Sequence, residues 1–491
     1  MDINKINTLG ELKKSKYQSQ SVKEELRANL ILKLQNGETA FKGIVGYEDT
    51  VIPKLERAIL AKHNINLLGL RGQAKTRIAR LMINLLDEYI PIVDGSEVMD
   101  DPLAPLSVYA KNLIKKQGDD TAIQWVHRAD RYVEKLATPD VSIADLIGDV
   151  DPIKAANLGL EYSDERVIHF GLIPRANRSI FVLNELPDLQ ARIQVALFNI
   201  LQEGDIQIRG FQFRFPLDVQ FVFTANPEDY TNRGSIITPL KDRIQAQIMT
   251  HYPKNIEEAK AITASEAKIE AKSAKNFIVA ELLKDLIEQI VFEARESEFV
   301  DANSGVSARL SISAYETLYS AIERRMIINK DKNGIARISD LIALVPSIIG
   351  KIEMVYEGEQ EGATNVSYAL IRQAIRKLAI QYFPELKDLK KIQSNLSTAY
   401  HELIQWFSSN QLDLLHDSSN EQHKNTLSKV VGLKELIEKK YPHLPEEGQL
   451  IMGELLLHAL AEYSYLNKEQ LERQFQFSDL LSSFMGSNQR N

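Results

Sequence analysis

The glycine-rich segment from Gly69 to Thr76, GLRGQAKT, constrains this chain more than any other feature. The apolar run 65–68 precedes it, and residues 78–83 follow it with the apolar spacing of a helix. A strand, a glycine loop, a Lys-Thr pair and a helix in this order are typical of a phosphate-binding loop. Glycines let the backbone turn its N–H groups toward phosphate oxygens, while Lys75 suits the β/γ phosphates and Thr76 suits Mg²⁺. The segment therefore predicts a nucleoside triphosphate site.

The residue before Lys75 departs from the usual form of such loops, because Ala74 stands where a third glycine is common. Alanine allows close approach to phosphate if its backbone is helical or extended, but it is strained at positive φ. A chance glycine-rich turn is the alternative to a phosphate loop. The flanking strand and helix, together with the lysine and threonine, favour the phosphate loop.

An apolar turn at residues 44–47 precedes the loop. Such a turn is a candidate wall for adenine, since a flat base needs apolar faces and backbone partners. Together the turn and the loop provide the predicted nucleotide site. Its expected contacts to a bound nucleotide are Val45, Gly46, Gly69, Gly72, Gln73, Ala74, Lys75, Thr76 and Arg77.

Composition excludes several classes of protein. The 491 residues are too many for one ordinary core and predict about two to four domains. There is no cysteine, which excludes disulfides and thiol catalysis, and the nine histidines lack the spacing of a zinc site. A net charge of −8 argues against a general nucleic-acid surface. Without an apolar N-terminal region or a long apolar span, we expect a cytoplasmic protein with no membrane insertion.

Residues 179–183 form the strongest strand pattern, because an apolar run without polar alternation predicts a strand buried on both faces. The strand ends on Asn184-Glu185. In nucleotide hydrolases an acidic pair lies at the carboxyl end of such a strand, beside the phosphate loop. The first acid orients a water on Mg²⁺ and the second polarises the attacking water. We therefore predict that Glu185 is catalytic and that Asn184, through water, belongs with Thr76 to the metal site.

The remaining sequence first continues the strand pattern and then becomes helical. Residues 207–215 alternate at period two and predict a β-hairpin. Residues 219–225 predict another buried strand, which ends before Asn226 at the same sheet edge. From about Pro253 onward the pattern is helical, and Pro384 with the charged run after it indicates a boundary.

Together these features resemble the AAA+ ATPases, and within them the MoxR and magnesium-chelatase subunit I group, from about Ile44 to Arg324. The loop form G-x-x-G-x-A-K-T, with alanine before the lysine, is familiar in MoxR-like proteins. Residues 170–180 are similar to the chelatase segment that leads into the strand called Walker B, and residues 145–151 are similar to the segment that opens the helix-2 insert. The hairpin at 205–216 lies where the pre-sensor-one insert belongs.

The resemblance implies an α/β fold, with an AAA+ P-loop NTPase core of parallel sheet and β-hairpin inserts, an all-α lid and an additional α-helical C-terminal domain. It assigns Asn226 to sensor 1, which helps to place the lytic water, and Arg309 to sensor 2 of the lid. Arg243 corresponds to the arginine finger that reaches the γ-phosphate of a neighbouring subunit, which implies a homo-oligomeric ring, expected to be a hexamer. The expected parts are an N-terminal helical segment at 1–40, the nucleotide-binding domain at 41–252, the lid at 253–385 and a helical C-terminal domain of unknown role at 386–491.

One departure from the family pattern concerns the Walker B strand, which should end in Asp-Glu and here ends in Asn184-Glu185. The asparagine carbonyl can accept a hydrogen bond from a water on Mg²⁺, but it lacks the negative charge that raises Mg²⁺ affinity. Glu185, which would polarise the attacking water, is present. We therefore expect weaker Mg²⁺ binding or slow hydrolysis rather than inactivity.

The predicted function is that of an ATP- and Mg²⁺-dependent AAA+ ring ATPase, a chaperone-like motor that remodels or activates a partner protein. The resemblance implies a partner with a von Willebrand A domain. Two alternatives stay open. The first is a nucleic-acid motor of the helicase-like AAA+ type, against which the acidic balance counts. The second is a weakly hydrolysing ATP-binding scaffold, which Asn184 would mark.

Overall fold

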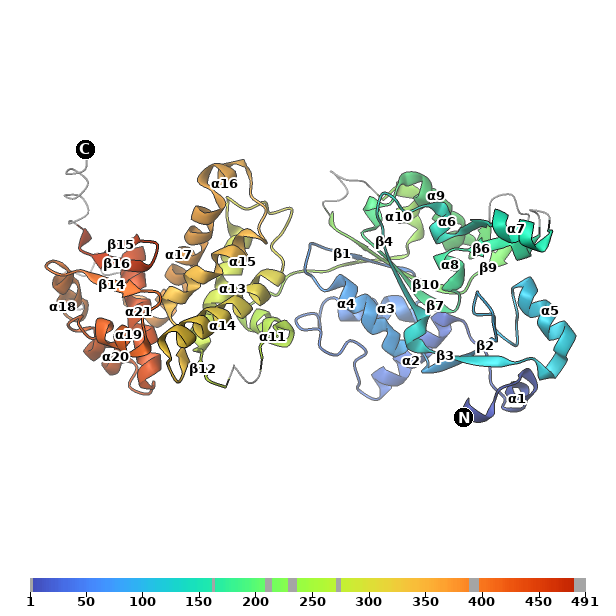
Figure 1. Cartoon of the computed structure of the whole chain (residues 1–491), viewed down its shortest axis with the longest axis horizontal. Helices are drawn as coiled ribbons and strands as arrows, with labels where there is room; N and C mark the ends of the chain where they lie inside the picture. The colour runs from blue at the N-terminus through green and yellow to red at the C-terminus, as the bar shows by residue number, and fades with distance from the viewer. Residues whose placement is uncertain are drawn as a thin grey trace. The chain divides into compact units, whose positions relative to one another are not determined.

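The computed structural model describes residues 3–160, 164–207, 214–227, 236–270, 275–387 and 397–480. The chain divides into two compact units, Met1–Tyr252 and Pro253–Asn491, which we call unit 1 and unit 2 (Figure 1). Unit 1 mixes strands and helices, whereas unit 2 consists mainly of helices. The change from mixed to helical structure therefore falls where the sequence pattern predicts it, at about Pro253.

Unit 1 is built on a five-stranded sheet in which all neighbouring strands pair in parallel. Every residue of β1, β7 and β10 is buried, as expected of parallel strands covered on both faces. This sheet confirms the predicted α/β class. The strands, in their order across the sheet, are β11 (Ala246–Met249), β1 (Ile65–Leu68), β10 (Val219–Ala225), β7 (Ser179–Asn184) and β4 (Tyr132–Leu136).

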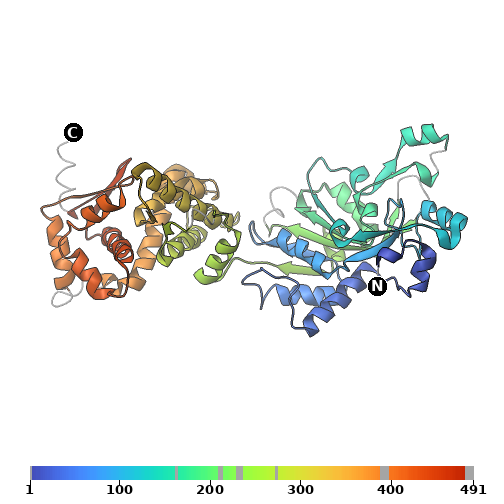
Figure 2. The ribbon, with the colours of Figure 1, turned by 60° about the horizontal axis from the view of Figure 1, so that its bottom comes forward.

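Helices cover both faces of this sheet (Figure 1 and Figure 2). One face packs with α2 (Val22–Gln35), α3 (Ile52–Leu60) and α4 (Lys75–Leu81) in a single apolar cluster. The other face packs with α9 (Ala191–Glu203) and α10 (Thr238–Arg243). Helix α2 lies within the N-terminal segment 1–40 that the sequence analysis expects to be helical. Because helices cover both faces of the sheet, its central strands are continuous apolar runs in the sequence.

Three short antiparallel pairs extend unit 1 beyond the sheet. The hairpin predicted at 205–216 is present in its described arms, β8 (Asp205–Gln207) and β9 (Arg214–Pro216), while its tip at 208–213 lies outside the described residues. The other pairs are β2 (Tyr89–Val93) with β3 (Ile123–His127), and β5 (Gly148–Val150) with β6 (Ile168–Phe170). The remaining α-helices are α1 (Leu9–Lys14), α5 (Val108–Gln117), α6 (Ile143–Leu146), α7 (Pro152–Leu158) and α8 (Leu172–Arg175).

Unit 2 packs its helices around one continuous apolar core, to which side chains from Leu282 to Phe477 contribute. Residues 397–480 therefore share a core with residues 275–387, and the predicted division at 385/386 stays a prediction. The helices are α11 (Ile256–Glu266), α13 (Glu281–Glu296), α14 (Arg309–Asn329), η8 (Ile338–Leu344), α15 (Val345–Ile349), α16 (Tyr356–Glu361), α17 (Ala363–Tyr382), α18 (Ser397–Phe407), α19 (Asn420–Leu427), α20 (Leu433–Lys440) and α21 (Glu446–Glu462).

A small sheet near the C-terminus adds to the predicted helices. Its three strands pair antiparallel in the order β14 (Leu412–Leu415), β16 (Gln474–Ser478) and β15 (Asn467–Gln470). Gln474 to Phe477 alternates polar and apolar residues, with Phe475 and Phe477 buried, which is the period of a strand. The short length of this alternation is why the sequence analysis missed it. A further pair, β12 (Phe277–Ile278) and β13 (Gly334–Ile335), lies between the long helices in sequence.

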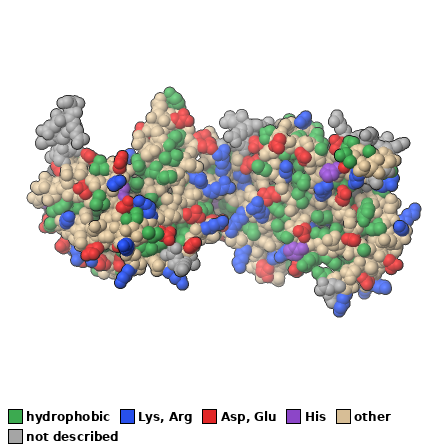
Figure 3. Space-filling view, viewed as in Figure 1, with side chains coloured by type: hydrophobic (Ala, Val, Ile, Leu, Met, Phe, Trp, Pro, Cys, Tyr) green, Lys and Arg blue, Asp and Glu red, His purple; other side chains and the backbone are tan. Residues whose placement is uncertain are grey.

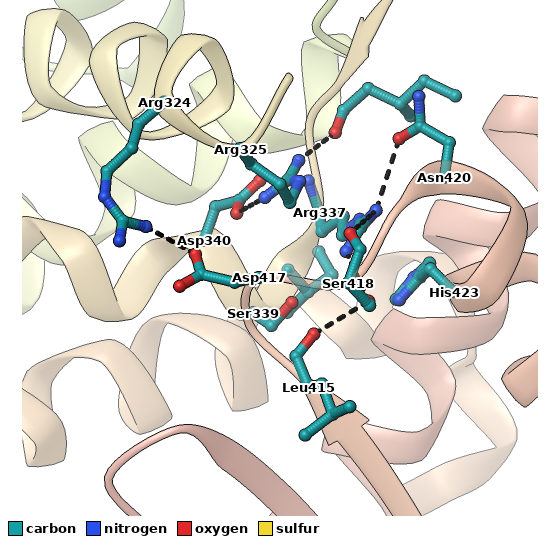
Figure 4. A network of polar contacts seen from close by, with 12 residues as sticks. Arg324, Arg325, Arg337, Ser339, Asp340, Leu415, Asp417, Ser418, Asn420 and His423 are labelled. Carbon is teal, nitrogen blue, oxygen red and sulfur yellow. Dashed lines mark hydrogen bonds and ion pairs between the residues drawn. The ribbon is translucent and has the colours of Figure 1, made fainter. Parts of the chain in front are cut away.

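A buried polar network connects the segment after β14 to the end of α14 and the start of η8 (Figure 4). The Arg337 side chain is almost fully buried, and it donates hydrogen bonds to the Ser418 hydroxyl at 3.1 Å, the Ser418 carbonyl at 3.0 Å and Asn420 Oδ1 at 3.3 Å. Arg325 forms an ion pair with Asp340 beside it. Burial lowers the pKa of Arg337 to about 10, which leaves the guanidinium charged at neutral pH. The network therefore ties the C-terminal residues to the preceding helices.

Candidate functional site

The glycine loop leaves the carboxyl end of β1 and leads directly into α4. A Cβ atom at Gly69 would lie 1.9 Å from the Thr250 hydroxyl oxygen, so only glycine fits there. Gly72 has a φ of +74°, in the left-handed region that favours glycine. Thr250 Oγ1 also donates a 2.7 Å hydrogen bond to Gln73 Oε1, and the Gln73 side chain is buried. The loop is therefore shaped by close packing against the strand that follows α10.

Ala74 has a positive φ, the conformation in which the sequence analysis expected alanine to be strained. Its backbone is left-handed, with φ 57° and ψ 15°, immediately before α4 begins at Lys75. For an L-residue with a Cβ this conformation is less stable by about 1–2 kcal/mol. Strained residues of this kind persist where the surrounding structure over-determines them, and they cluster at functional sites.

Lys75 connects the loop to the ends of two other strands. Its side chain is only 7% exposed, and its ammonium donates to the Gly69 carbonyl, to the Leu70 carbonyl at 3.0 Å and to Asn226 Oδ1 at 2.7 Å. The Asn226 amide in turn donates to Glu185 Oε2 at 2.9 Å. A cation at the start of α4, an amide after β10 and a carboxylate after β7 thus form one chain of contacts at the carboxyl edge of the sheet.

Glu185 occupies a second strained position, with φ 55° and ψ 49°, directly after β7. Its backbone N–H donates to Thr224 Oγ1 at 3.2 Å. The turn directs its carboxylate toward Asn226 rather than along the strand. A carboxylate held by an amide at a sheet edge can take a proton from a water that approaches a phosphate bound there.

Asn184, the last residue of β7, is held by side chains from both neighbouring strands. Its Nδ2 donates to Glu134 Oε1 on β4 at 2.7 Å, and its Oδ1 accepts from Thr224 Oγ1 on β10 at 3.0 Å. Thr76 lies on the first turn of α4, half-buried. Sequence reasoning missed Glu134 and Thr224, because only the pairing of the strands brings them to Asn184. The one signal was a carboxylate inside the otherwise strand-like segment 132–136.

The oxygen atoms near this edge suit a hard cation. Hydroxyl, amide and carboxylate oxygens from Thr76, Asn184 and Glu185 are the donors that Mg²⁺ prefers, and Mg²⁺ usually takes its remaining ligands from water and substrate phosphate. Within the described residues there is no group of three or more His, Asp or Glu side chains that could hold a metal by themselves. The donor set therefore fits a cation that arrives with a phosphate ligand, and Thr76 and Asn184 stay the predicted metal residues.

The turn at 44–47 reaches the loop through Tyr47, which the sequence analysis did not select. The Tyr47 hydroxyl donates to the Gln73 carbonyl at 3.1 Å and to the His251 carbonyl at 2.7 Å. Its ring meets the His251 ring edge-on, with centroids 4.9 Å apart. Burial raises the pKa of Tyr47 to about 12, so the hydroxyl stays a donor at neutral pH. Val45 and Gly46 lie half-buried on the same turn, and their contact with a base stays a prediction.

Of the two predicted arginines, Arg243 contacts residues outside this cluster and Arg309 belongs to the other unit. Arg243, at the end of α10, donates to Gln202 Oε1 at 2.9 Å and to the Pro239 carbonyl at 2.7 Å, and its guanidinium lies 5.0 Å from the centre of the Phe198 ring. Arg309 is the exposed first residue of α14 and belongs to unit 2. Their roles as arginine finger and sensor 2 stay predictions. Of the predicted residues, Gly69, Lys75, Asn226 and Glu185 are joined by hydrogen bonds. Asn184 ends β7 beside them in sequence, Gly72, Gln73 and Ala74 lie on the loop before Lys75, and Thr76 and Arg77 follow Lys75 on α4.

Surface properties add two observations. Acidic and basic side chains both lie on the visible face of each unit (Figure 3). No helix within the part of the chain that the structure describes is long and apolar enough to cross a membrane. The whole sequence has a net charge of −8.

Comparison with known proteins agrees with the geometry of the sheet edge. The family described as the Sigma-54 interaction domain matches residues 162–248, which include β7, α9 and β10. The chain is 25% identical over 264 residues to the magnesium-chelatase 38 kDa subunit of Rhodobacter capsulatus, a match that covers 52% of this chain and 68% of that protein. It is also 25% identical over 229 residues to the corresponding subunit of Cereibacter sphaeroides, covering 44% of this chain and 60% of that protein.

Among solved structures, the chain aligns with a cryo-EM-based model of the complex between subunits BchI and BchD of magnesium chelatase. That alignment has 19% sequence identity and a TM-score of 0.33, and it covers 65% of this chain and 98% of the other. The sequence matches, the parallel sheet and the phosphate loop agree with one another: the chain has the fold of the AAA+ ATPases and is similar in sequence to the magnesium-chelatase 38 kDa subunit.

Proposed function

We propose that this protein binds ATP with Mg²⁺ at the edge formed by β1, β10 and β7, and hydrolyses it as a motor that acts on another protein. The observation that carries the proposal is the chain of contacts from Lys75 through Asn226 to Glu185, with distances of 2.7 and 2.9 Å. It places a cation for phosphate, an amide that can orient water and a base within reach of one another. Phosphoryl transfer depends mainly on such positioning and charge neutralisation.

Each residue has a distinct part in the proposed hydrolysis. Lys75 neutralises the β and γ phosphates, and the backbone of the 69–74 loop surrounds them. Glu185 accepts a proton from water as the water oxygen bonds to the γ phosphorus and the bond to the β-phosphate oxygen breaks, which releases ADP and phosphate. Mg²⁺, held through Thr76 and through a water on Asn184, would neutralise charge on the phosphates. Asn226 keeps the Glu185 carboxylate oriented during the attack.

We further propose that the active form is a ring, with a hexamer as the expected size, in which Arg243 completes the site of a neighbouring subunit. The support is indirect: Arg243 is half-buried at the end of α10 and contacts α9 rather than Lys75 of its own chain. An arginine supplied by a neighbour raises phosphoryl-transfer rates by about 10³–10⁵ where it has been measured. Hydrolysis should then require assembly.

The test is ATP hydrolysis measured against protein concentration, with particle size measured in parallel, for the wild type and Arg243→Ala. Arg166→Ala is the matched control, because Arg166 is another arginine of unit 1, with a side chain that is 57% exposed and forms an ion pair with Asp164. We expect specific activity to rise with assembly, and Arg243→Ala to lose it while it still binds ATP and Arg166→Ala keeps it. Equal activity of Arg243→Ala and the control would refute the role of Arg243 in a neighbour's site.

The partner is proposed from the resemblance alone: a protein with a von Willebrand A domain, met in the cytoplasm. Stimulation of the ATPase by such a domain, and by no other acidic protein of similar size, would support this choice. Stimulation by DNA that is lost as salt rises would instead favour the helicase-like alternative.

A weakly hydrolysing scaffold is the second candidate, and Asn184 at the end of β7 is the observation that favours it. An amide at this place carries no charge to attract Mg²⁺. If the wild type assembles with ATP but turns it over slowly, Asn184→Asp should raise the rate. A rate unchanged by Asn184→Asp would show that Asn184 is not the limiting residue.

A further inference from the structure

The Asn184 side chain can serve a metal site in only one of its two amide orientations, whereas an aspartate at the same place could serve it in either. An amide has one oxygen and one NH₂ group, and only the oxygen suits Mg²⁺ or a hydrogen bond from a water on Mg²⁺. Rotation of the amide by half a turn exchanges the two groups at nearly the same shape. An asparagine can therefore serve a metal site only if its neighbours select one orientation.

Glu134 makes this selection possible from the neighbouring strand. The parallel pairing of β4 with β7 sets Leu136 opposite Asn184 and Glu134 opposite Val182, so Glu134 and Asn184 point to the same face of the sheet. Glu134 Oε1 lies 2.7 Å from the Asn184 amide. An ionised carboxylate only accepts hydrogen bonds, so the group that faces it must be the NH₂.

The oxygen of Asn184 consequently faces the opposite way, toward β10, where Thr224 Oγ1 donates to it at 3.0 Å. In the order of the sheet, β10 lies between β7 and β1, and β1 leads into the phosphate loop. The residue after β10 is Asn226, which contacts Lys75. The Asn184 oxygen therefore lies on the side of β7 nearest the phosphate loop, and its NH₂ lies on the side away from it.

Glu134 is itself held in place by Arg80 and Tyr132. Arg80 donates to its two oxygens at 3.0 and 3.3 Å, and the Tyr132 hydroxyl donates at 3.1 Å. Arg80 lies on α4, one turn after Thr76, so the ion pair also connects Glu134 to the helix that begins at Lys75. The Glu134 side chain is 22% exposed and Asn184 is 8% exposed, so water competes only weakly for their contact.

We propose that Glu134 is a positioning residue for the magnesium site: it holds the Asn184 amide with its oxygen toward the nucleotide. This inference rests on the proposed ATP-binding function. It explains how asparagine can stand where the related ATPases are expected to have aspartate. An aspartate has oxygens at both ends and needs no such partner, and beside Glu134 it would bring two carboxylates together.

The test measures the affinity of the full chain for a fluorescent ATP analogue (mant-ATP) as Mg²⁺ is titrated, and again in EDTA. Glutamine at position 134 can meet either end of the Asn184 amide, so Glu134→Gln removes the selection without removing the shape. We expect Glu134→Gln to raise the Mg²⁺ concentration at half-effect about five-fold, as for loss of one ordinary hydrogen-bond preference. Nucleotide affinity in EDTA should be unchanged, because Glu134 does not touch the phosphate loop.

The rescue variant is the double substitution Glu134→Gln with Asn184→Asp. It exchanges the amide and the carboxylate, keeps one hydrogen bond between them and gives position 184 two oxygens. We expect its Mg²⁺ dependence to return to that of the wild type. Asp164→Asn, a carboxylate-to-amide change in the surface ion pair with Arg166, is the matched control and should leave the titration unchanged.

Either of two results would overturn the inference. The first is a Mg²⁺ concentration at half-effect for Glu134→Gln that equals that of the wild type. The second is a raised Mg²⁺ concentration at half-effect that the added Asn184→Asp substitution does not lower to the wild-type value. Melting temperatures in EDTA establish that the variants fold. If Glu134→Gln loses its melting transition, Glu134→Asp serves instead, since it withdraws the carboxylate from Asn184 and should raise the Mg²⁺ requirement in the same way. A wild type that binds no mant-ATP under any condition would refute the proposed function itself, which is a distinct result.

Discussion

The ion pair between Glu25 and Arg131 provides the sharpest test of how unit 1 is held together. The two side chains are 3% and 1% exposed, and they form two parallel hydrogen bonds of 2.7 and 2.6 Å. Arg131 also donates to the Arg178 carbonyl at 2.9 and 2.7 Å, and Glu25 accepts from the Asp87 N–H at 2.6 Å. The pair thus joins α2 to the starts of β4 and β7, the strands that carry Glu134 and Asn184.

The expected energies follow from burial. Removing one partner leaves the other charge buried without compensation, so Glu25→Leu and Arg131→Met should each lower the free energy of unfolding by about 4 kcal/mol. The double substitution leaves no buried charge. It leaves the Asp87 N–H and the Arg178 carbonyl without these partners, at about 1–2 kcal/mol each, so we expect a total of about 3 kcal/mol. Additivity would instead predict about 8 kcal/mol, twice the single loss.

The assay is urea unfolding of the full chain, followed by tryptophan fluorescence. The sequence has two tryptophans, Trp125 in unit 1 and Trp406 in unit 2. A Trp406→Phe background leaves Trp125, whose Nε1 donates to the Ile6 carbonyl at 2.8 Å, as the reporter of unit 1. The wild type, both single variants and the double variant are compared in that background.

Either of two results would refute the reasoning. A double variant that loses the sum of the single losses would mean that the two charges do not depend on each other. Single variants that each lose less than about 1 kcal/mol, the range of exposed pairs, would mean that water reaches the pair in solution.

Three further predictions concern the phosphate loop and the sheet. Ala74→Gly should raise the free energy of unfolding without nucleotide by up to about 1 kcal/mol in urea, because glycine adopts the φ of 57° at this position without strain. In a thermal-shift assay, ATP at a hundred times its Kd should stabilise the wild type by about 2.7 kcal/mol, whereas Lys75→Met, which removes the ammonium bonded to Asn226, should show no shift. Burial raises the pKa of Asp218 in the folded protein from 3.8 to about 6, above the value in the unfolded chain. The contribution of Asp218 to the free energy of unfolding is therefore complete at low pH and is lost as pH rises from about 4 through about 6. Asp218→Asn should therefore remove that part of the pH dependence in urea unfolding measured from pH 4 to 7, and an unchanged profile would contradict the shift.

Much of unit 1 could be predicted from the sequence, because its strongest signals are local. The run 180–183 within β7 is apolar without alternation, and a strand buried on both faces requires that pattern. The loop from Gly69 to Thr76 carries its own turn chemistry in its glycines. Near Pro253 the period of the apolar residues changes from two to about 3.6. This change is also a local signal, and it marks the start of the helical region.

Only the tertiary structure decided which polar groups meet. Glu134 lies fifty residues before Asn184, and the register of two parallel strands, which depends on packing across the whole sheet, brings their side chains to 2.7 Å. The left-handed backbone of Ala74 likewise comes from the fit of the loop against its surroundings, since alanine by itself disfavours that conformation. Residue type and local spacing determined the strands and the phosphate loop, whereas the orientation of the Asn184 amide depends on long-range pairing that no local pattern encodes.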